Sequence, residues 1–139
     1  MVDDETVRRR LRRLDELVQQ LGELAALSRE AFLADPVKQA AAAWFLQTAI
    51  QVVLDIGGHI LADRGVVDWE EYRQIPQRLA DLNLVPRTLA ERLEKAAGQR
   101  NILVHMYLDV DAAMVHETIQ QDLDAFCDFA ECALRVVDG

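Results

Sequence analysis

The chain has 139 residues, of which 51% are hydrophobic, and a formal net charge of -9 at pH 7. A chain of this length holds one continuous core, so we expect a single domain over residues 1–139. The strong negative charge argues against a general nucleic-acid binder, but it is compatible with an enzyme that holds a few phosphates in a local basic pocket. The acidic N-terminus does not resemble a signal peptide and no apolar run is expected to span a membrane, so we expect a cytoplasmic protein.

The first predicted helix runs from about Asp3 to Ser28, because apolar residues recur along it three and four positions apart. Its acidic start suits the positive end of a helix dipole. Five arginines cluster early in this helix: Arg8, Arg9, Arg10, Arg12 and Arg13. They are expected to form a solvated face paired with acidic residues, or alternatively to reach RNA or a protein partner.

A second long helix is predicted from Asp35-Pro36, which is typical of an N-cap followed by proline at the first helical position, to about Ala62. Asp55 and His59 lie four residues apart and therefore share a face of this helix. They are expected to form a surface pair, or alternatively to support a nearby site.

A short third helix is predicted after Asp68, which would form a capping box with Glu71. Tyr72 is expected on the apolar face of this helix, and Pro76 is expected to bend or split it. Pro86 then opens a further helix.

Gly98 predicts a break in that further helix, and the last helix is predicted to begin at Asp109 or Asp111. The whole pattern predicts an all-α fold, an up-and-down bundle of four main helices with one or two short helices.

Metal binding is not expected from this sequence. Cys127 and Cys132 are too few and wrongly spaced for a disulfide framework or a zinc site. No carboxylate cluster has the spacing of metal ligands, and His116 is expected to face solvent. The sequence therefore predicts neither a metal nor another cofactor.

The segment from Gln99 to Tyr107 places an arginine and a histidine around a short apolar run. Arg100 brings a permanent charge in a planar fork suited to phosphate oxygens, and His105 can exchange a proton near neutral pH. On a straight helix, five residues advance roughly 500 degrees, so these two side chains would point about 140 degrees apart. They can face one cavity only if the backbone departs from a helix there or if two chains contribute.

The pattern Arg-Asn-x-x-x-His-x-Tyr, formed by Arg100, Asn101, His105 and Tyr107, resembles the Arg-x4-6-His motif of the HEPN superfamily. The tyrosine two positions after the histidine resembles the HepT branch, the toxin of HepT/MntA toxin–antitoxin pairs. The resemblance covers nearly the whole chain in length and helix order, and its specific part is the stretch from Arg100 to Tyr107. It implies a HEPN-like bundle and a homodimer whose cleft receives an arginine and a histidine from each protomer.

The resemblance implies a metal-independent endonuclease that acts on RNA and not on DNA. The ribose 2′-hydroxyl would attack the adjacent phosphorus, the 5′-oxygen would leave, and a 2′,3′-cyclic phosphate would remain. His105 would be the acid/base, and Arg100 would bind the scissile phosphate and stabilise its developing charge. Asn101 would orient Arg100, His105 or the ribose.

The same resemblance implies that Tyr107 is a control point and not a catalyst. A small MntA-type nucleotidyltransferase, the antitoxin, would transfer AMP units to the hydroxyl of Tyr107. This AMPylation would add bulk and negative charge beside Arg100 and so block the pocket.

Two other functions remain open at this stage. The bundle could be a non-catalytic HEPN module that binds a nucleotide or a nucleotidyltransferase, which the acidic net charge favours. It could also be a helical dimerisation unit whose arginine-rich first helix pairs with an acidic partner.

Overall fold

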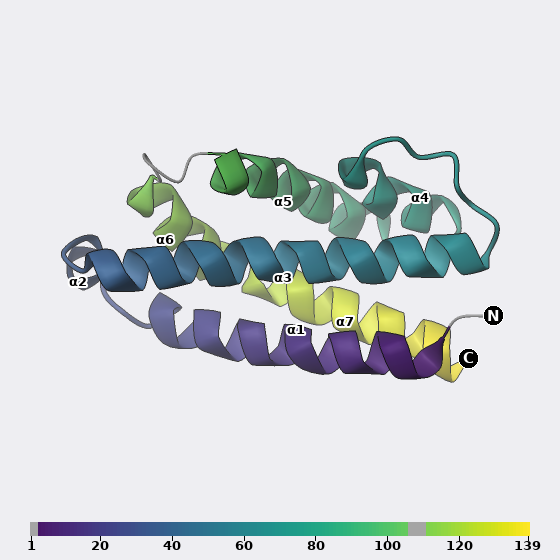
Figure 1. The fold of residues 1–139 in the computed structure, drawn as a ribbon, viewed down its shortest axis with the longest axis horizontal. Coiled ribbons are helices and arrows are strands. Elements are labelled where there is room, and N and C mark those ends of the chain that lie inside the picture. Colours follow the sequence, from purple (N-terminus) through teal and green to yellow (C-terminus); the bar gives the residue numbers. More distant parts are fainter. Residues whose placement is uncertain (1–2, 106–110) are drawn as a thin grey trace.

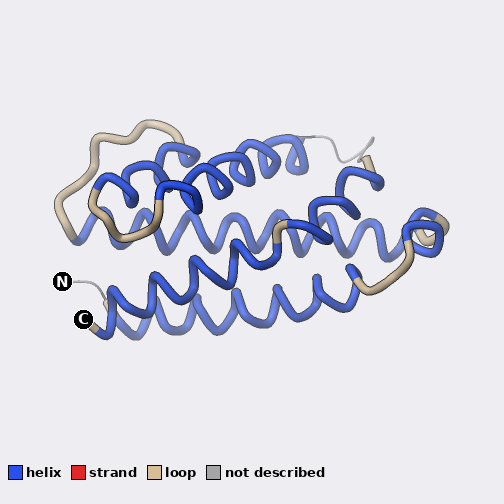
Figure 2. The backbone as a smooth tube through the Cα atoms, turned by 180° about the vertical axis from the view of Figure 1, so that it is seen from behind, coloured by secondary structure: helices blue, strands red, loops and turns tan. Residues whose placement is uncertain are grey.

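The computed structural model describes residues 3–105 and 111–139, and over these ranges it is helical without any strand (Figures 1 and 2). The elements in chain order are α1 (Asp4–Ala25), α2 (Arg29–Leu33), α3 (Pro36–Asp63), the 3-10 helix η1 (Tyr72–Gln74), α4 (Ile75–Asp81), α5 (Arg87–His105), α6 (Ala112–Gln121) and α7 (Leu123–Asp138). The all-α prediction is therefore confirmed.

The bundle is organised around α3, which packs against α1 on one side and against α4 and α5 on the other (Figure 1). α7 lies alongside α1, and the first and last described residues lie close together at one end of the bundle (Figures 1 and 2). The long helices alternate in direction along the chain. This is the up-and-down arrangement that the sequence predicts.

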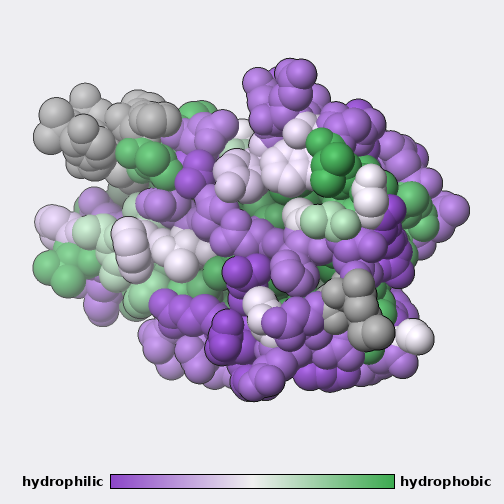
Figure 3. Space-filling view, turned by 45° about the vertical axis from the view of Figure 1, so that its right-hand side comes forward, coloured by the Kyte–Doolittle hydropathy of each residue, from purple (hydrophilic) through white to green (hydrophobic). Residues whose placement is uncertain are grey.

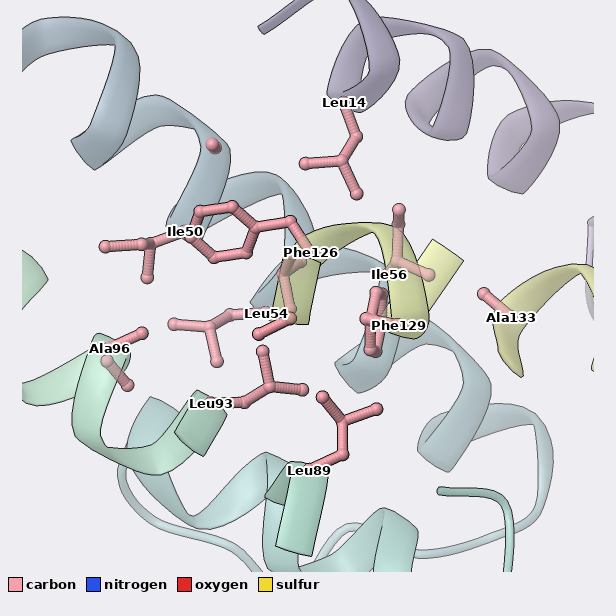
Figure 4. Packing of buried hydrophobic residues seen from close by; sticks show 14 of the residues in the cluster. Leu14, Ile50, Leu54, Ile56, Leu89, Leu93, Ala96, Phe126, Phe129 and Ala133 are labelled. Carbon is pink, nitrogen blue, oxygen red and sulfur yellow. The ribbon is translucent and has the colours of Figure 1, made fainter. Parts of the chain in front are cut away.

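The core lies where α3, α5 and α7 meet. Figure 4 shows Leu54 of α3, Leu93 of α5 and Phe126 of α7 directed toward one another, and each is almost completely buried. Burying a side chain of this size contributes about 1.5–3 kcal/mol relative to leaving it in water. The core therefore fixes α5, the helix that carries Arg100, against the centre of the molecule.

α3 is long and apolar enough to cross a membrane by length and composition, contrary to the expectation from the sequence. Half of its most apolar stretch is buried inside the bundle, as it is in the central helix of a packed core. The face drawn in Figure 3 is mainly hydrophilic, and its hydrophobic residues gather only in small separate groups. The apolar character of α3 is thus explained by its central position.

The predicted cap of α3 is confirmed. Asp35 Oδ1 accepts hydrogen bonds from the backbone N–H groups of Val37 (3.1 Å) and Lys38 (3.2 Å), and Pro36 occupies the first helical position. The first helix is shorter than predicted, because Ser28 caps the separate short helix α2 through the N–H of Ala31 (3.1 Å).

The predicted capping box of Asp68 and Glu71 is wrong. Gln74 Oε1 instead accepts from the N–H groups of Glu70 (2.7 Å) and Glu71 (3.1 Å), while Asp68 forms an ion pair with Arg78 at 3.4 Å. The box therefore lies three residues further along and starts η1.

The helix predicted to be bent or split by proline is divided, since η1 ends just before α4, whose first turn contains Pro76. Tyr72 does not lie on a buried face as predicted, because its side chain is 47% exposed.

The predicted break at Gly98 is also wrong, since α5 continues through it to His105. A glycine costs a helix about 1 kcal/mol relative to alanine, and the burial of Leu93 and Leu103 on either side outweighs that cost. The predicted final helix is divided at Asp122 into α6 and α7. Arg92 of α5 donates to the carbonyl oxygen of Gln121 at this division (3.2 Å) and so satisfies one freed acceptor.

Candidate functional site

A cavity of about 470 Å³ opens between the C-terminal half of α5 and the segment that leads into η1. Buried residues of α3 and α5 supply its apolar side, and charged residues surround the rest. The lining residues are Leu54, Glu70, Glu71, Tyr72, Arg73, Ala97, Arg100 and Asn101. Two of the four residues of the predicted site, Arg100 and Asn101, therefore lie in one cavity.

Arg100 is half-buried, and its guanidinium is only partly satisfied. Its Nη1 donates to Asn101 Oδ1 at 3.3 Å, whereas its Nε is buried without a hydrogen-bond partner among the described residues. Within the described ranges, no carboxylate forms an ion pair with it. An unsatisfied buried donor costs roughly 1–3 kcal/mol, so this edge of Arg100 is suited to accept an anion that enters the cavity.

His105 is the last residue of α5, and its side chain, like the whole of Tyr107, lies outside the described part of the chain. Because α5 is continuous, positions 100 and 105 are separated by about 140 degrees around one helix axis. The departure from helical geometry that would turn both toward one side does not occur between them.

Reasoning from the sequence missed the cavity residues near η1. Glu71 and Arg73 form an ion pair at 3.2 Å, and the ring of Tyr72 lies 5.8 Å from that of Trp69 at an interplanar angle of 37°. These residues are far from Arg100 in the sequence, and no spacing rule connects them with it. Only the packing of η1 on α5 brings them together.

The other two histidines have structural surroundings that differ from the predictions. His116 is buried, not solvent-facing: its Nε2 lies 3.0 Å from the carbonyl oxygen of Leu27, and its ring packs against Phe32. Asp55 accepts from Gln51 Nε2 (2.7 Å), and no described interaction joins it to His59. Across residues 3–105 and 111–139, no three His, Cys, Asp or Glu side chains gather in the manner of metal ligands. The absence of a metal from the mechanism stays a prediction.

The arginine cluster of α1 is separated from the cavity, because α3 lies between α1 and α5 (Figure 1). Arg8 pairs with Asp138 of α7, which raises the pKa of the guanidinium, and Arg13 pairs with Glu16 at 3.4 Å. The cluster is thus partly paired with acidic residues, as one of its two readings predicts. It does not contribute to the site around Arg100.

In comparisons with known proteins, the matching family and the similar proteins are named as ribonucleases. The Ribonuclease HepT-like family matches residues 5–133. A protein of Archaeoglobus fulgidus, which its name describes provisionally as an RNase, is 27% identical over 113 residues, or 81% of each chain. The mRNA nuclease HepT of Shewanella oneidensis is 30% identical over 86 residues, which cover 62% of this chain and 65% of that protein.

Solved structures agree in fold. The tri-AMPylated HEPN toxin of Shewanella oneidensis, in complex with MNT antitoxin, superposes with a TM-score of 0.85 at 23% identity, over 97% of this chain and 99% of that chain. The cytosolic protein YutE of Bacillus subtilis superposes with a TM-score of 0.82 at 21% identity, over 96% of this chain and 90% of that chain. Because the family match extends over nearly the whole sequence, the chain belongs to the Ribonuclease HepT-like family.

Proposed function

We propose that this protein is the RNA-cleaving toxin of a HepT/MntA-type toxin–antitoxin pair, with Arg100 and His105 as its catalytic residues. The observation that carries the proposal is the partly unsatisfied guanidinium of Arg100 in a polar cavity of about 470 Å³. The family match and the names of the relatives from Archaeoglobus and Shewanella support ribonuclease chemistry. The protein acts as a single domain in the cytoplasm, in line with the cytosolic YutE.

Arg100 binds the scissile phosphate through its free edge and stabilises the charge that develops on the phosphorane. His105 moves the proton at the attacking 2′-hydroxyl or at the leaving 5′-oxygen, which leaves a 2′,3′-cyclic phosphate. Asn101 orients Arg100, as its Oδ1 already accepts from the guanidinium at 3.3 Å. The reaction uses these side chains without a metal ion.

The active site forms in a homodimer, with Arg100 of one subunit meeting His105 of the other. The support is the helical geometry of α5, which separates the two positions by about 140 degrees within one chain. A second copy across the cleft brings its histidine to the phosphate held by Arg100, so each subunit supplies one arginine and one histidine to the cleft.

Tyr107 is the site at which a MntA-type nucleotidyltransferase neutralises the toxin by AMP transfer. The support is the fold shared with an AMPylated toxin that was solved together with its antitoxin. Adenylate at this position adds negative charge close to the catalytic arginine and competes with substrate phosphate. Intact mass after co-expression with the nucleotidyltransferase tests this role, and Tyr107→Phe should show no added AMP.

Cleavage of RNA in the presence of EDTA tests the catalytic assignment. Arg100→Ala and His105→Ala should each abolish cleavage while helix content and dimer mass stay as in the parent. Arg92→Ala is a matched control on the same helix, because Arg92 faces the α6–α7 junction and not the cavity. Equal cleavage by parent and both catalytic variants would refute the assignment.

A mixing experiment tests the shared site separately. When inactive Arg100→Ala subunits are exchanged with inactive His105→Ala subunits, some mixed dimers hold one intact arginine–histidine pair and should regain part of the parent activity. No regain, with subunit exchange verified by mass spectrometry, would refute the two-subunit arrangement. Nucleotide binding without any RNA turnover, unaffected by His105→Ala, would select the non-catalytic alternative.

A further inference from the structure

The cavity beside Arg100 contains a cation, an anion and an aromatic ring that no described contact fully uses. Arg100 has the buried, unpartnered Nε, and the Glu70 carboxylate has no hydrogen bond or ion pair to the described residues. The side chain of Tyr72 is 47% exposed. By contrast, the two other charged residues of the lining, Glu71 and Arg73, are paired with each other. The available groups are therefore of three different kinds.

The ring of Tyr72 is held in place from behind. The centres of the Tyr72 and Trp69 rings are 5.8 Å apart. Trp69 in turn packs against α3, because its Cζ2 is 3.5 Å from the point that a Cβ at Gly58 would occupy. A fixed and exposed aromatic ring is the surface on which proteins commonly stack an unpaired nucleic-acid base. Tyr72 can thus offer a base a contact that is already ordered.

A nucleotide carries the three complementary groups. Its phosphate is anionic and its base has a flat π face. Adenine, cytosine and guanine also bear an amino group that can donate a hydrogen bond to a carboxylate. Uracil has no amino group, and its single imide N–H lies between two carbonyl oxygens that a carboxylate repels. We propose that this cavity binds one nucleotide of single-stranded RNA, with the base on Tyr72, its amino group on Glu70 and its phosphate on Arg100.

This proposal rests on the ribonuclease function proposed above and adds two features to it. Tyr72 and Glu70 become substrate-binding residues, and the enzyme acquires a preference for amino-bearing bases over uracil next to the scissile phosphate. Both features concern the binding of substrate and not the proton transfers.

Binding to uncleavable RNA separates the proposal from catalysis. Short single-stranded oligoadenylate, oligocytidylate and oligouridylate with 2′-O-methyl groups lack the attacking hydroxyl, and fluorescence anisotropy measures their affinity. Tyr72→Ala should weaken binding of oligoadenylate by roughly 5- to 150-fold, the value of one lost stacking contact. Tyr72→Phe should keep the parent affinity because it keeps the ring.

Val67→Ala is the matched control, since Val67 belongs to the same segment and is 74% exposed but does not line the cavity. It should bind as the parent does. Glu70→Gln should remove most of the preference for oligoadenylate and oligocytidylate over oligouridylate, because the amide can also donate to uracil. With cleavable RNA, Tyr72→Ala should raise KM and leave kcat nearly unchanged.

Equal affinity of Tyr72→Ala and Val67→Ala would overturn the nucleotide subsite and leave the ribonuclease proposal intact. Equal binding of uracil and adenine oligonucleotides by the parent would overturn the role of Glu70. A parent protein that neither binds nor cleaves RNA would overturn both the subsite and the proposed function.

Discussion

Substitution of Gly57 by alanine tests how closely α4 approaches α3. A Cβ at this buried position would lie 2.7 Å from Ile75 Cγ2 and 3.1 Å from Leu79 Cδ1. The nearer atom belongs to a β-branched side chain with little freedom to turn away, so α4 itself would have to shift. Overpacking of this kind costs about 1–3 kcal/mol, whereas replacing a helical glycine by alanine gains about 1 kcal/mol.

We therefore expect Gly57→Ala to lower the free energy of unfolding by up to about 2 kcal/mol. Gly22→Ala is the matched control, because a Cβ at Gly22 on α1 meets nothing within 4 Å. This control should be more stable than the parent by about 1 kcal/mol. Urea unfolding followed by circular dichroism measures both variants. If Gly57→Ala proves as stable as Gly22→Ala, the close contact of α3 and α4 is not present.

The remaining predictions concern the continuity of α5, the ion pair of Arg92 with Asp124, the buried His116 and the thiol of Cys127. Gly98→Ala should stabilise the protein by about 1 kcal/mol, since α5 passes through this open position unbroken, and a loss of stability would contradict that continuity. The Arg92 guanidinium lowers the pKa of the Asp124 carboxyl, so this pair stabilises the fold fully above the ordinary pKa of 3.8 and loses its effect as pH falls through the lower folded-state value. Asp124→Asn should thus cost less than about 1 kcal/mol at neutral pH and nothing in strong acid; an unchanged difference at both pH values would refute the pairing. His116→Ala should cost roughly 1–3 kcal/mol by leaving the Leu27 carbonyl without its partner, with His59→Ala as a nearly neutral comparison in the same denaturation assay. Partial burial and the neighbouring Asp128 raise the pKa of the Cys127 thiol, so alkylation of Cys127 by iodoacetamide at mildly alkaline pH should be slower in the folded protein than in urea, and equal rates at this residue would contradict the shift.

The site was only partly predictable from the sequence. Arg100 and Asn101 stand out because the motif is local, and the structure brings both into one cavity. The sequence predicts a buried helix face for Tyr72, because a hydrophobic pattern cannot distinguish a core residue from one that lines a cavity. The sequence predicts a surface position for His116, because a polar side chain gives no sign of the carbonyl that it meets in the turn between α1 and α2.

The sequence by itself determined the all-α class and most of the long helical segments, and it singled out the motif that carries Arg100. Helical periodicity, the Asp35-Pro36 cap and the spacing of Arg100 from His105 depend on residues only a few positions apart, and local rules describe such residues well. The tertiary structure alone decided that α5 stays unbroken through Gly98, that η1 packs beside Arg100, and that the buried Nε of Arg100 meets no hydrogen-bond partner among the described residues. These features come from contacts between segments distant in the chain, whose free energy outweighs local preferences and leaves no mark in the spacing of residues.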